Sequence, residues 1–274
     1  MLRECLESIR RFPPLGCDLE VIVVDNNSAD GSADMVASEF PDVQLIRHPT
    51  NSGYAEGNNL ALQHVTGDLV LLLNPDVIMH EHALTNAVRV MQDNPSIGGL
   101  GCRLLLLDGT TQDSLRGFPD PIPVLFEYLG LGRIFSRIPY FAAYRMRYFD
   151  YDRAGDADQP MASFFLISRR CLDDVGGMDT DFPIFFNDVD WCYRAKRLKG
   201  WRIAYTPEAV VTHHHGGSTR QVKPRMIKES HRSLIRFYEK HYKDSMSPAL
   251  FALIKAAILC NEWRNLRQAA KSGA

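Results

Sequence analysis

Residues Leu69 to Val77 read Leu-Val-Leu-Leu-Leu-Asn-Pro-Asp-Val. Five apolar residues without alternation predict a strand that is buried on both faces, and the Asn-Pro pair that follows forces the chain out of the strand. Asp76 is therefore expected at the rim of a sheet. In an open α/β sheet this rim, outside the carboxyl ends of the strands, is where ligands bind.

Asn74 and Asp76 at this rim have two interpretations. A carboxylate with a carboxamide two residues before it can hold a hard divalent cation, because Mg²⁺ takes one or two protein carboxylates and fills its other positions with water and phosphate oxygens. Asn, Pro and Asp are also ordinary turn residues, so the segment taken alone is equally consistent with a simple turn.

The composition is that of an ordinary globular protein. The 274 residues are 45% hydrophobic and 23% charged, and the formal net charge of −2 gives no reason to expect a nucleic-acid partner. The six cysteines are scattered without any Cys-x-x-Cys spacing, which argues against a disulfide framework and a structural zinc site. No signal peptide is evident at the N-terminus. We therefore expect a cytoplasmic protein in a reducing compartment.

The segments before this strand alternate between buried strand and helix. The pattern predicts strands over Glu20–Asp25 and Val43–Arg47, a helix over Ala33–Glu39 and a further helix opened by residues 51–59. This alternation predicts an α/β fold with a mostly parallel, Rossmann-like sheet flanked by helices. A helix over residues 2–11 comes first, whereas a doubly wound domain usually begins with a strand. Either the sheet lacks an inner strand or the true start lies upstream.

Regular patterns continue after Asp76 with one long interruption. The expected elements are a helix over Glu81–Gln92 and strands over Ile97–Leu107, Ser163–Ile167, Gly200–Tyr205 and Ala209–His213. Between them, Phe118–Pro160 is rich in proline and aromatic residues and has no regular period. Such a segment is either a functional loop or lid, or a poorly ordered insertion.

Asp188 and Asp190 fall in the first turn of a predicted helix. Acidic residues there complement the helix dipole without needing any further role. Asp188 also follows the apolar pair Phe185-Phe186, which would desolvate the carboxylate and raise its pKa toward that of a general base. Asp188 is therefore the candidate base.

His213, His214 and His215 end an apolar strand. Since side chains alternate along a strand, at most two of the three point the same way. One imidazole would complete a metal site with Asp76. The alternative is that all three are histidines at a solvated strand end.

These separate segments form an ordered set of blocks. They are Val23–Ser32, Asn51–Ala55, Leu73–Asp76, Gly176–Asp179, Asn187–Arg194, Gly200–Arg202 and His213–Ser218. In this order they resemble the inverting glycosyltransferases of family 2, and within that family the bacterial rhamnosyltransferase-like enzymes of polysaccharide assembly. The resemblance extends over roughly residues 1–240.

The resemblance implies a GT-A fold over residues 1–222. Its donor half would be about residues 1–107 and its acceptor half about residues 108–222, followed by a C-terminal helical extension over residues 223–274. The resemblance also implies that the sheet binds a nucleotide.

The resemblance further implies roles for individual residues. Asp25 matches the carboxylate that reads the nucleobase, and Asp76 matches the last acid of the metal-binding motif, here Asn-Pro-Asp. Asp188 matches the catalytic base, and His213 matches a histidine that in some members ligates the metal, Mg²⁺ or Mn²⁺. The other residues expected to contact the donor are Asn27, Asn51, Gly53, Asn58 and Asn74.

The implied reaction is a single displacement. The metal neutralises the diphosphate leaving group while Asp188 removes the proton of an acceptor hydroxyl, which attacks the anomeric carbon from the opposite face. The resemblance implies a nucleotide-sugar donor, dTDP-rhamnose foremost. The implied acceptor is a saccharide or lipid-linked saccharide of a cell-surface polysaccharide.

Three features depart from the family pattern. Asn187 stands where Glu is usual, Phe164-Phe165 replaces small residues and would narrow the pocket, and the opening strand of the family is missing. The missing strand makes a non-catalytic sugar-nucleotide-binding or scaffold protein the rival hypothesis. A nucleotidyltransferase, the second rival, would carry a Gly-rich, basic phosphate loop near its start, and the sequence has none.

Two more helices are predicted at the C-terminus. Met226–Tyr242 is basic and amphipathic, and Ala249–Cys260 is nearly all apolar apart from Lys255. Twelve residues cannot span a bilayer, which needs about 20. With the cations beyond it, residues 249–271 form either an interfacial helix on the inner face of the plasma membrane or a helix that packs on the domain or on a second subunit of a homodimer.

Overall fold

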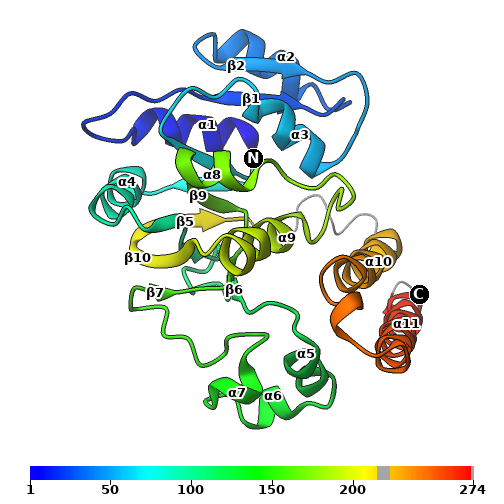
Figure 1. Ribbon diagram of the computed structural model, residues 1–274. Helices are drawn as coiled ribbons and strands as arrows, with labels where there is room; N and C mark the ends of the chain where they lie inside the picture. Colours follow the sequence, from blue (N-terminus) through cyan, green and yellow to red (C-terminus); the bar gives the residue numbers. More distant parts are fainter. Residues whose placement is uncertain (215–222, 273–274) are drawn as a thin grey trace.

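The computed structural model describes residues 1–214 and 223–272 (Figure 1). The helices are α1 Leu2–Arg11, α2 Ser32–Glu39, α3 Tyr54–Leu62, α4 Ala83–Asp93, α5 Pro121–Tyr128, α6 Leu131–Ile134, α7 Pro139–Ala142, α8 Arg169–Val175, α9 Asn187–Tyr193, α10 Lys223–His241 and α11 Pro248–Ser272. The strands are β1 Ile22–Asp25, β2 Gln44–Arg47, β3 Leu69–Leu73, β4 Val77–Met79, β5 Ile97–Leu105, β6 Leu115–Arg116, β7 Gly155–Asp156, β8 Gln159–Pro160, β9 Phe164–Ser168 and β10 Arg202–His213. A π-helical turn, Arg194–Leu198, continues α9.

The central sheet has six strands in the order β3-β9-β5-β10-β4, with β7 added to β10. β5 and β10 are the one pair of parallel neighbours among its described strands, whereas β9 is antiparallel to both of its neighbours and β4 is antiparallel to β10. The expectation of a mostly parallel sheet is therefore wrong, and the sheet is mixed. The physical reason lies in the connections between strands. The turn from β3 to β4 is too short for the crossover that two parallel neighbouring strands need, so β4 pairs with β10 and not with β3.

A second sheet lies apart from the first. β1 and β2 form a parallel pair, and no other described strand is hydrogen-bonded to either of them. β3 likewise has a strand partner on one side only, which is β9. Within the described residues, no strand therefore joins the β1–β2 pair to the central sheet.

The strand β9 separates two hydrophobic cores. Phe164 packs into the core that contains residues of α1 and α4, and Phe165 packs into the core beneath α3, α8 and α9. Each ring is only 1% exposed. The prediction that these two rings narrow the substrate pocket is therefore wrong, because both rings are buried inside the hydrophobic cores.

The structure is more regular in two places than the sequence indicated. The Gly200–Tyr205 and Ala209–His213 strands are one strand, β10, with a bulge between Thr206 and Val210. The Phe118–Pro160 segment contains the three helices α5, α6 and α7, which form the end of the molecule opposite β1 and β2 (Figure 1).

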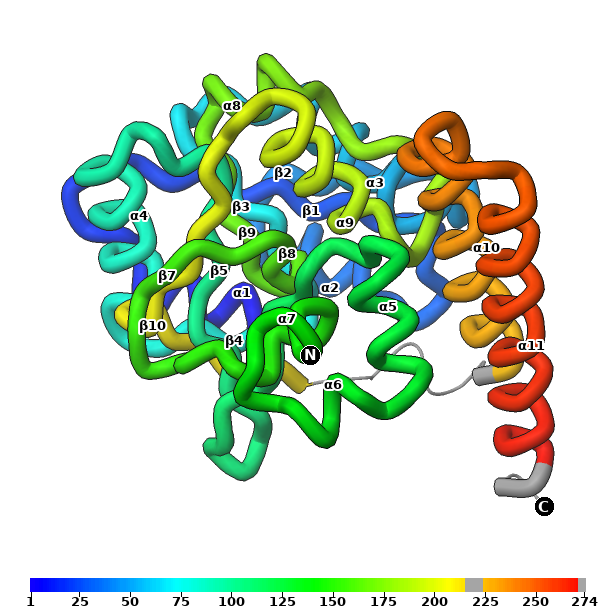
Figure 2. The backbone as a smooth tube through the Cα atoms, turned by 60° about the horizontal axis from the view of Figure 1, so that its bottom comes forward, coloured from blue at the N-terminus to red at the C-terminus, as the bar shows by residue number. Residues whose placement is uncertain are grey.

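The C-terminal helices α10 and α11 lie side by side (Figure 2). α11 has 25 residues, so it extends well past the apolar run on which its prediction rested. Phe251, Ile254 and Ile258 face Leu234 and Tyr238 of α10. One face of α11 therefore packs on the protein, and no helix within the described ranges is both long and apolar enough to cross a membrane.

Candidate active site

Asp76 and His213 lie side by side, where the sequence predicts a metal site. β4 starts directly after Asp76 and pairs with the end of β10, so that Val77 lies opposite His213. The backbone amide of His214 donates to the Asp76 carbonyl oxygen at 2.9 Å. The carboxylate oxygen Oδ1 of Asp76 then lies 3.4 Å from Nε2 of His213. We call these two side chains the metal pair.

Hydrogen bonds fix the His213 ring, which is only 4% exposed. Its Nδ1 lies 2.9 Å from Gln112 Oε1, and since an amide oxygen only accepts, Nδ1 carries the proton. Nε2 lies 3.2 Å from the Ser163 hydroxyl, which donates to it when the ring is neutral. Ser163 Oγ in turn accepts from Asn74 Nδ2 at 3.2 Å, so the Asn74 carboxamide supports the histidine through the serine.

The metal pair fits a divalent cation. Asp76 Oδ1 is buried, and no donor in the described parts of the chain is hydrogen-bonded to it. It lies 3.4 Å from His213 Nε2, so a cation near both atoms would meet a negative charge and, with the ring neutral, a nitrogen lone pair. A carboxylate and an imidazole whose other nitrogen is hydrogen-bonded are ordinary ligands of such a cation.

The protein supplies only part of a coordination shell. Within residues 1–214 and 223–272, no group of three or more His, Cys, Asp and Glu side chains could hold a metal ion. The other ligands would therefore be water and oxygens of the substrate, which is the usual arrangement where a divalent cation holds a phosphate.

Asp188 lies in the first turn of α9 with several donors around it. Gln159 Nε2 donates to its Oδ2 at 2.9 Å, and the Val189 amide donates to its Oδ1 at 2.8 Å. Burial raises the Asp188 pKa above its ordinary value, and the hydrogen bonds from Val189, Ala162 and Gln159 offset this only in part. A raised pKa makes the carboxylate a stronger base, which suits the removal of a proton from a hydroxyl.

The surroundings of Asp188 include two further groups. The charge of Asp188 raises the pKa values of Tyr54 and Cys192, which places these two groups close to the carboxylate. The Phe186 ring lies 5.8 Å from the ring of Phe237 on α10, so it packs toward the C-terminal helices. The raised pKa of Asp188 has the direction that the sequence predicts.

Asn187, which stands where the family has Glu, holds the loop before α9. Its side chain is 2% exposed, and Nδ2 donates to the carbonyl oxygens of Phe182 at 3.2 Å and Ile184 at 3.0 Å. Its Oδ1 accepts from the Asp188 amide at 2.8 Å. Asn187 therefore positions the backbone of the candidate base through neutral hydrogen bonds.

The dipeptide Ala162-Ser163, just before β9, joins the candidate base to the metal pair. The Tyr54 hydroxyl donates to the Ala162 carbonyl oxygen at 3.3 Å. Burial raises the Tyr54 pKa, and the charges of Asp188 and Asp76 raise it further, so both carboxylates lie near this hydroxyl. Ser163 supports the histidine of the metal pair, as described above. The structure thus gathers the predicted metal and base residues around one short segment.

Two adjoining loops carry the residues expected at the donor. Asn26 joins these loops, since its Oδ1 accepts from the Ser52 amide at 3.1 Å and its Nδ2 donates to the Gly53 carbonyl oxygen at 2.9 Å. Asp25, at the end of β1, accepts from the Ser28 amide at 3.3 Å. A half-buried carboxylate therefore lies at the rim of the β1–β2 pair.

The remaining predicted donor residues differ in their surroundings. Asn27 and Asn51 are exposed on the two loops, and Asn51 Oδ1 accepts from the Gly53 amide at 3.3 Å. Asn58 donates its Nδ2 to the Tyr54 carbonyl oxygen at 2.8 Å, within α3. The Asn58 amide nitrogen is therefore used inside its own helix.

Gly53 packs against the loop that leads to α9. Its φ is +94°, and a Cβ here would lie 2.7 Å from the carbonyl oxygen of Pro183. The same oxygen accepts from the Tyr54 amide at 2.7 Å. The start of α3 is therefore tied to the segment that positions Asp188.

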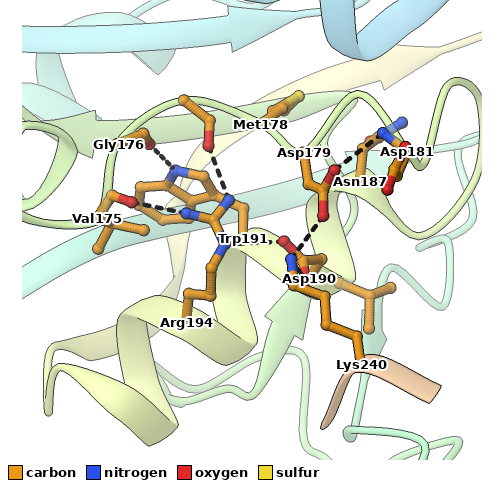
Figure 3. A network of polar contacts seen from close by, with 12 residues as sticks. Val175, Gly176, Met178, Asp179, Asp181, Asn187, Asp190, Trp191, Arg194 and Lys240 are labelled. Carbon is orange, nitrogen blue, oxygen red and sulfur yellow. Dashed lines mark hydrogen bonds and ion pairs between the residues drawn. The ribbon is translucent and has the colours of Figure 1, made fainter. Parts of the chain in front are cut away.

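Asp190 links α9 to α10 (Figure 3). Its carboxylate is fully buried, with Arg194 Nε at 2.8 Å and both Lys240 Nζ and His241 Nε2 at 2.7 Å. Burial pushes the Asp190 pKa upward, but hydrogen bonds from His241, Lys240 and Arg194 outweigh it and lower the pKa to about 2. We call these four side chains the α9–α10 latch.

Several residues of the site carry no sequence signal of their own. Gln112 and Gln159 lie in or near the segment without a regular period, and their roles depend on contacts with His213 and Asp188 that are distant in sequence. Asn26 lies in the block Val23–Ser32, so the sequence could have singled out its position. Its hydrogen bond to Ser52 could not have been predicted from the sequence.

Comparison with known proteins agrees with this geometry. The model of glycosyl transferase family 2 matches residues 1–152. The N-acetylglucosaminyl-diphospho-decaprenol L-rhamnosyltransferase of Mycobacterium tuberculosis is 26% identical over 234 residues, covering 80% of this chain and 74% of the relative. The poly-beta-1,6-N-acetyl-D-glucosamine synthase of Staphylococcus aureus is 24% identical over 250 residues, covering 89% of this chain and 55% of the relative.

Solved structures show the same fold. The mannosyltransferase PcManGT of Pyrobaculum calidifontis, in complex with GDP-Man and Mn²⁺, matches with a TM-score of 0.60 at 21% identity, covering 100% of this chain and 72% of that chain. TarS of S. aureus matches with a TM-score of 0.55 at 16% identity, covering 94% of this chain and 66% of that chain. The fold is therefore GT-A-like, and because the family model covers more than half of its residues, this chain belongs to glycosyl transferase family 2.

Proposed function

We propose that this transferase is a metal-dependent inverting enzyme. It moves a sugar from a nucleotide-diphosphate donor, with dTDP-rhamnose the first candidate, to a saccharide or lipid-linked saccharide acceptor of a cell-surface polysaccharide. The observation that carries the proposal is the buried Asp76 Oδ1, which accepts no hydrogen bond from the described residues and lies 3.4 Å from His213 Nε2, close to a base of raised pKa. The rhamnosyltransferase among the relatives supports the choice of donor.

In the proposed mechanism Asp188 removes the acceptor proton. Its carboxylate is held by Gln159 and by backbone amides, so it is oriented before the acceptor arrives. Asp76 and His213 would hold Mg²⁺ or Mn²⁺, which supplies positive charge to the leaving diphosphate when bound. Asp25 would read the nucleobase, and the exposed loop residues would contact the donor.

The proposal assigns a place to each part of the chain. Residues 1–107 form the donor half, residues 108–222 form the acceptor half, and residues 223–274 form the helical extension. A lipid-linked acceptor would bring the protein to the inner face of the plasma membrane as a peripheral protein. The outward face of residues 249–271 is one candidate contact, with the bilayer or with a second subunit.

Calorimetric titration tests the proposal. Uridine-, guanosine- and deoxythymidine-diphosphate sugars are titrated with and without Mn²⁺ into the wild type, into Asp76→Asn and into Asp93→Asn. Asp93 ends α4 and is exposed, so its variant is a matched charge control. We expect Mn²⁺-dependent binding of one donor in the wild type and the control, and its loss in Asp76→Asn.

Two results would decide against the proposal. If the Asp76→Asn variant binds the donor as tightly as the wild type with Mn²⁺, the metal pair has no role in donor binding. If donor binds but no acceptor ever receives sugar, the non-catalytic sugar-nucleotide-binding or scaffold protein becomes the better description.

A further inference from the structure

Large exposed apolar side chains are concentrated in the segment that contains α5, α6 and α7. Residues 121–140 contain eight of them. They are Ile122, Leu125, Tyr128, Leu129, Ile134, Phe135, Ile138 and Tyr140. Ile134 is 72% exposed, Tyr140 is 63% exposed and Leu129 is 62% exposed. We call this surface the α5–α7 apolar tip, because these helices form one end of the molecule (Figure 1).

Contacts between aromatic rings hold the three helices of the apolar tip together. The Phe126 ring contacts the rings of Tyr140 and Phe141 at 5.3 Å and 5.0 Å, and the Phe135 ring lies 5.0 Å from that of Phe141. Val124 is buried. Phe126 and Phe141 are half-buried, and they contact Phe135 and Tyr140 of the exposed set. Ring contacts therefore hold the tip in place while its outer apolar side chains stay exposed.

The charge on this surface has one sign. Arg133 and Arg137 are exposed among the apolar residues. Glu127 is the single carboxylate in residues 121–140, and its side chain is only 13% exposed. It accepts from Arg147 at 2.6 Å and 2.8 Å, so its charge is already compensated. The tip thus presents arginines and no exposed acid.

This combination favours one kind of partner. Aliphatic and aromatic side chains interleaved with arginines match the interface of a bilayer, where apolar groups enter the acyl region and cations meet anionic headgroups. A protein partner, including a second copy of this chain, would have to place acidic groups against the arginines, because an arginine buried without an acidic partner is costly. The position of α5, α6 and α7 at one end of the molecule also suits shallow insertion (Figure 1).

We propose that the α5–α7 apolar tip docks this protein on an anionic membrane surface. The inference places the membrane contact in the middle of the chain, in residues 121–140, and gives α11 the role of packing on α10. It extends the membrane association of the proposed function, yet it requires neither a donor nor transfer. The tip lies within residues 108–222, the proposed acceptor half, so docking would bring that half to the lipid surface.

Flotation of the full chain with lipid vesicles tests this proposal. The vesicles contain phosphatidylcholine alone or phosphatidylcholine with phosphatidylglycerol. The variants are Leu129→Glu with Ile134→Glu in the tip, Leu253→Glu with Trp263→Glu on the outer face of α11, and Leu15→Glu as a control. Leu15 is 66% exposed in the loop between α1 and β1, so it matches the tip residues in exposure but lies in the other half.

We expect the wild type to float with the anionic vesicles and salt to weaken this binding. The tip variant should lose about tenfold or more of the vesicle affinity, because two exposed apolar side chains that would enter the bilayer become charged. Arg133→Gln and Arg137→Gln should each cost about fivefold on anionic vesicles only. The Leu15 control should bind like the wild type, and all variants should keep the wild-type circular dichroism.

Three outcomes would overturn the proposal. The first is a wild type that floats with neither kind of vesicle. The second is loss of binding in the α11 variant with full binding in the tip variant, which would make α11 the contact. The third is a wild-type dimer in sedimentation velocity that the tip variant converts to monomer without any change in flotation, which would make the tip a self-association surface. Donor calorimetry is independent of all three, so failure here is distinguishable from failure of the proposed function.

Discussion

Asp188 and Asp190 lie two residues apart on α9, yet their pKa values move in opposite directions. Burial raises the Asp188 pKa, and its hydrogen-bond donors, Gln159 and backbone amides, carry no net charge. Asp190 is buried too, but the cations of the latch lower its pKa to about 2. The first carboxylate is thus prepared to take up a proton, and the second is held in its charged form.

Asp188→Asn separates activity from stability. The variant should lose transfer by about 10²- to 10⁴-fold because the base is gone. At neutral pH the ionised Asp188 costs folding free energy, since its pKa is raised in the folded state, so the melting temperature should stay equal or rise. Turnover and thermal unfolding of the variant check both parts. A variant that unfolds at lower temperature would show that Asp188 stabilises the fold instead.

Gln112→Leu tests the orientation of the metal pair. Removing the acceptor of the His213 Nδ1 proton should weaken Mn²⁺ binding by about 10- to 100-fold while leaving both ligands in place. Electron paramagnetic resonance of free Mn²⁺ during titration measures this affinity. Gln92→Leu, at an exposed position on α4, is the control. Equal Mn²⁺ affinity in the two variants would show that Gln112 does not support the metal pair.

At this scale the sequence indicated the candidate site residues better than their supports. Asp76, His213 and Asp188 could be named because each falls in a block that resembles the family, and the structure places them around one short segment. Gln112 and Gln159 could not, because a glutamine in a segment without periodicity carries no sign of its distant partner. The structure alone supplies that partner.

Among the elements, α3 is held by the close approach of Gly53 to Pro183. Gly53→Ala should destabilise the protein by more than about 1 kcal/mol, because the residue has positive φ and the new Cβ would meet the Pro183 carbonyl oxygen at 2.7 Å. Gly16→Ala is the matched control, since Gly16 also has positive φ but nothing within 4 Å of a Cβ. Urea denaturation measures both. Equal losses would mean that the close approach to Pro183 contributes nothing beyond backbone strain.

Helices and strands could be located from the sequence, but strand direction could not. Apolar runs locate β3, β5 and β9, and amphipathic runs locate α4 and α10. The direction of β9 depends on how the chain returns from the α5–α7 region, which no local pattern encodes. The sequence of that region, rich in proline and of mixed charge, predicts no regular structure. Its three helices, α5, α6 and α7, are stabilised by contacts between aromatic rings rather than by a regular apolar pattern.

For the whole molecule, the α9–α10 latch predicts how stability responds to acid. The folded pKa of Asp190 is about 2, below its unfolded value of about 3.9, so the ionised carboxylate stabilises the fold above about pH 4. That contribution, on the order of 2–3 kcal/mol, is lost as pH falls from about 4 to about 2. Asp190→Asn should therefore be less stable than the wild type at pH 6 and approach it near pH 2.

Urea denaturation of the two proteins across this pH range gives the measurement. Asp93→Asn serves again as the control, because this exposed carboxylate has no described partner. A stability difference between wild type and Asp190→Asn that stays constant from pH 6 to pH 2 would contradict the proposed linkage.

The strands β1 and β3, each with a strand partner on one side only among the described residues, also have a practical consequence. Both consist mainly of Val, Ile and Leu, and all four residues of β1 are only half-buried. Strands of this composition with free backbone groups recruit other strands, so concentrated samples should self-associate more readily on mild heating than a closed sheet would. A short synthetic peptide of alternating valine and threonine should pair with the unpaired sides of β1 and β3. Such a peptide would keep the protein from self-associating during crystallisation.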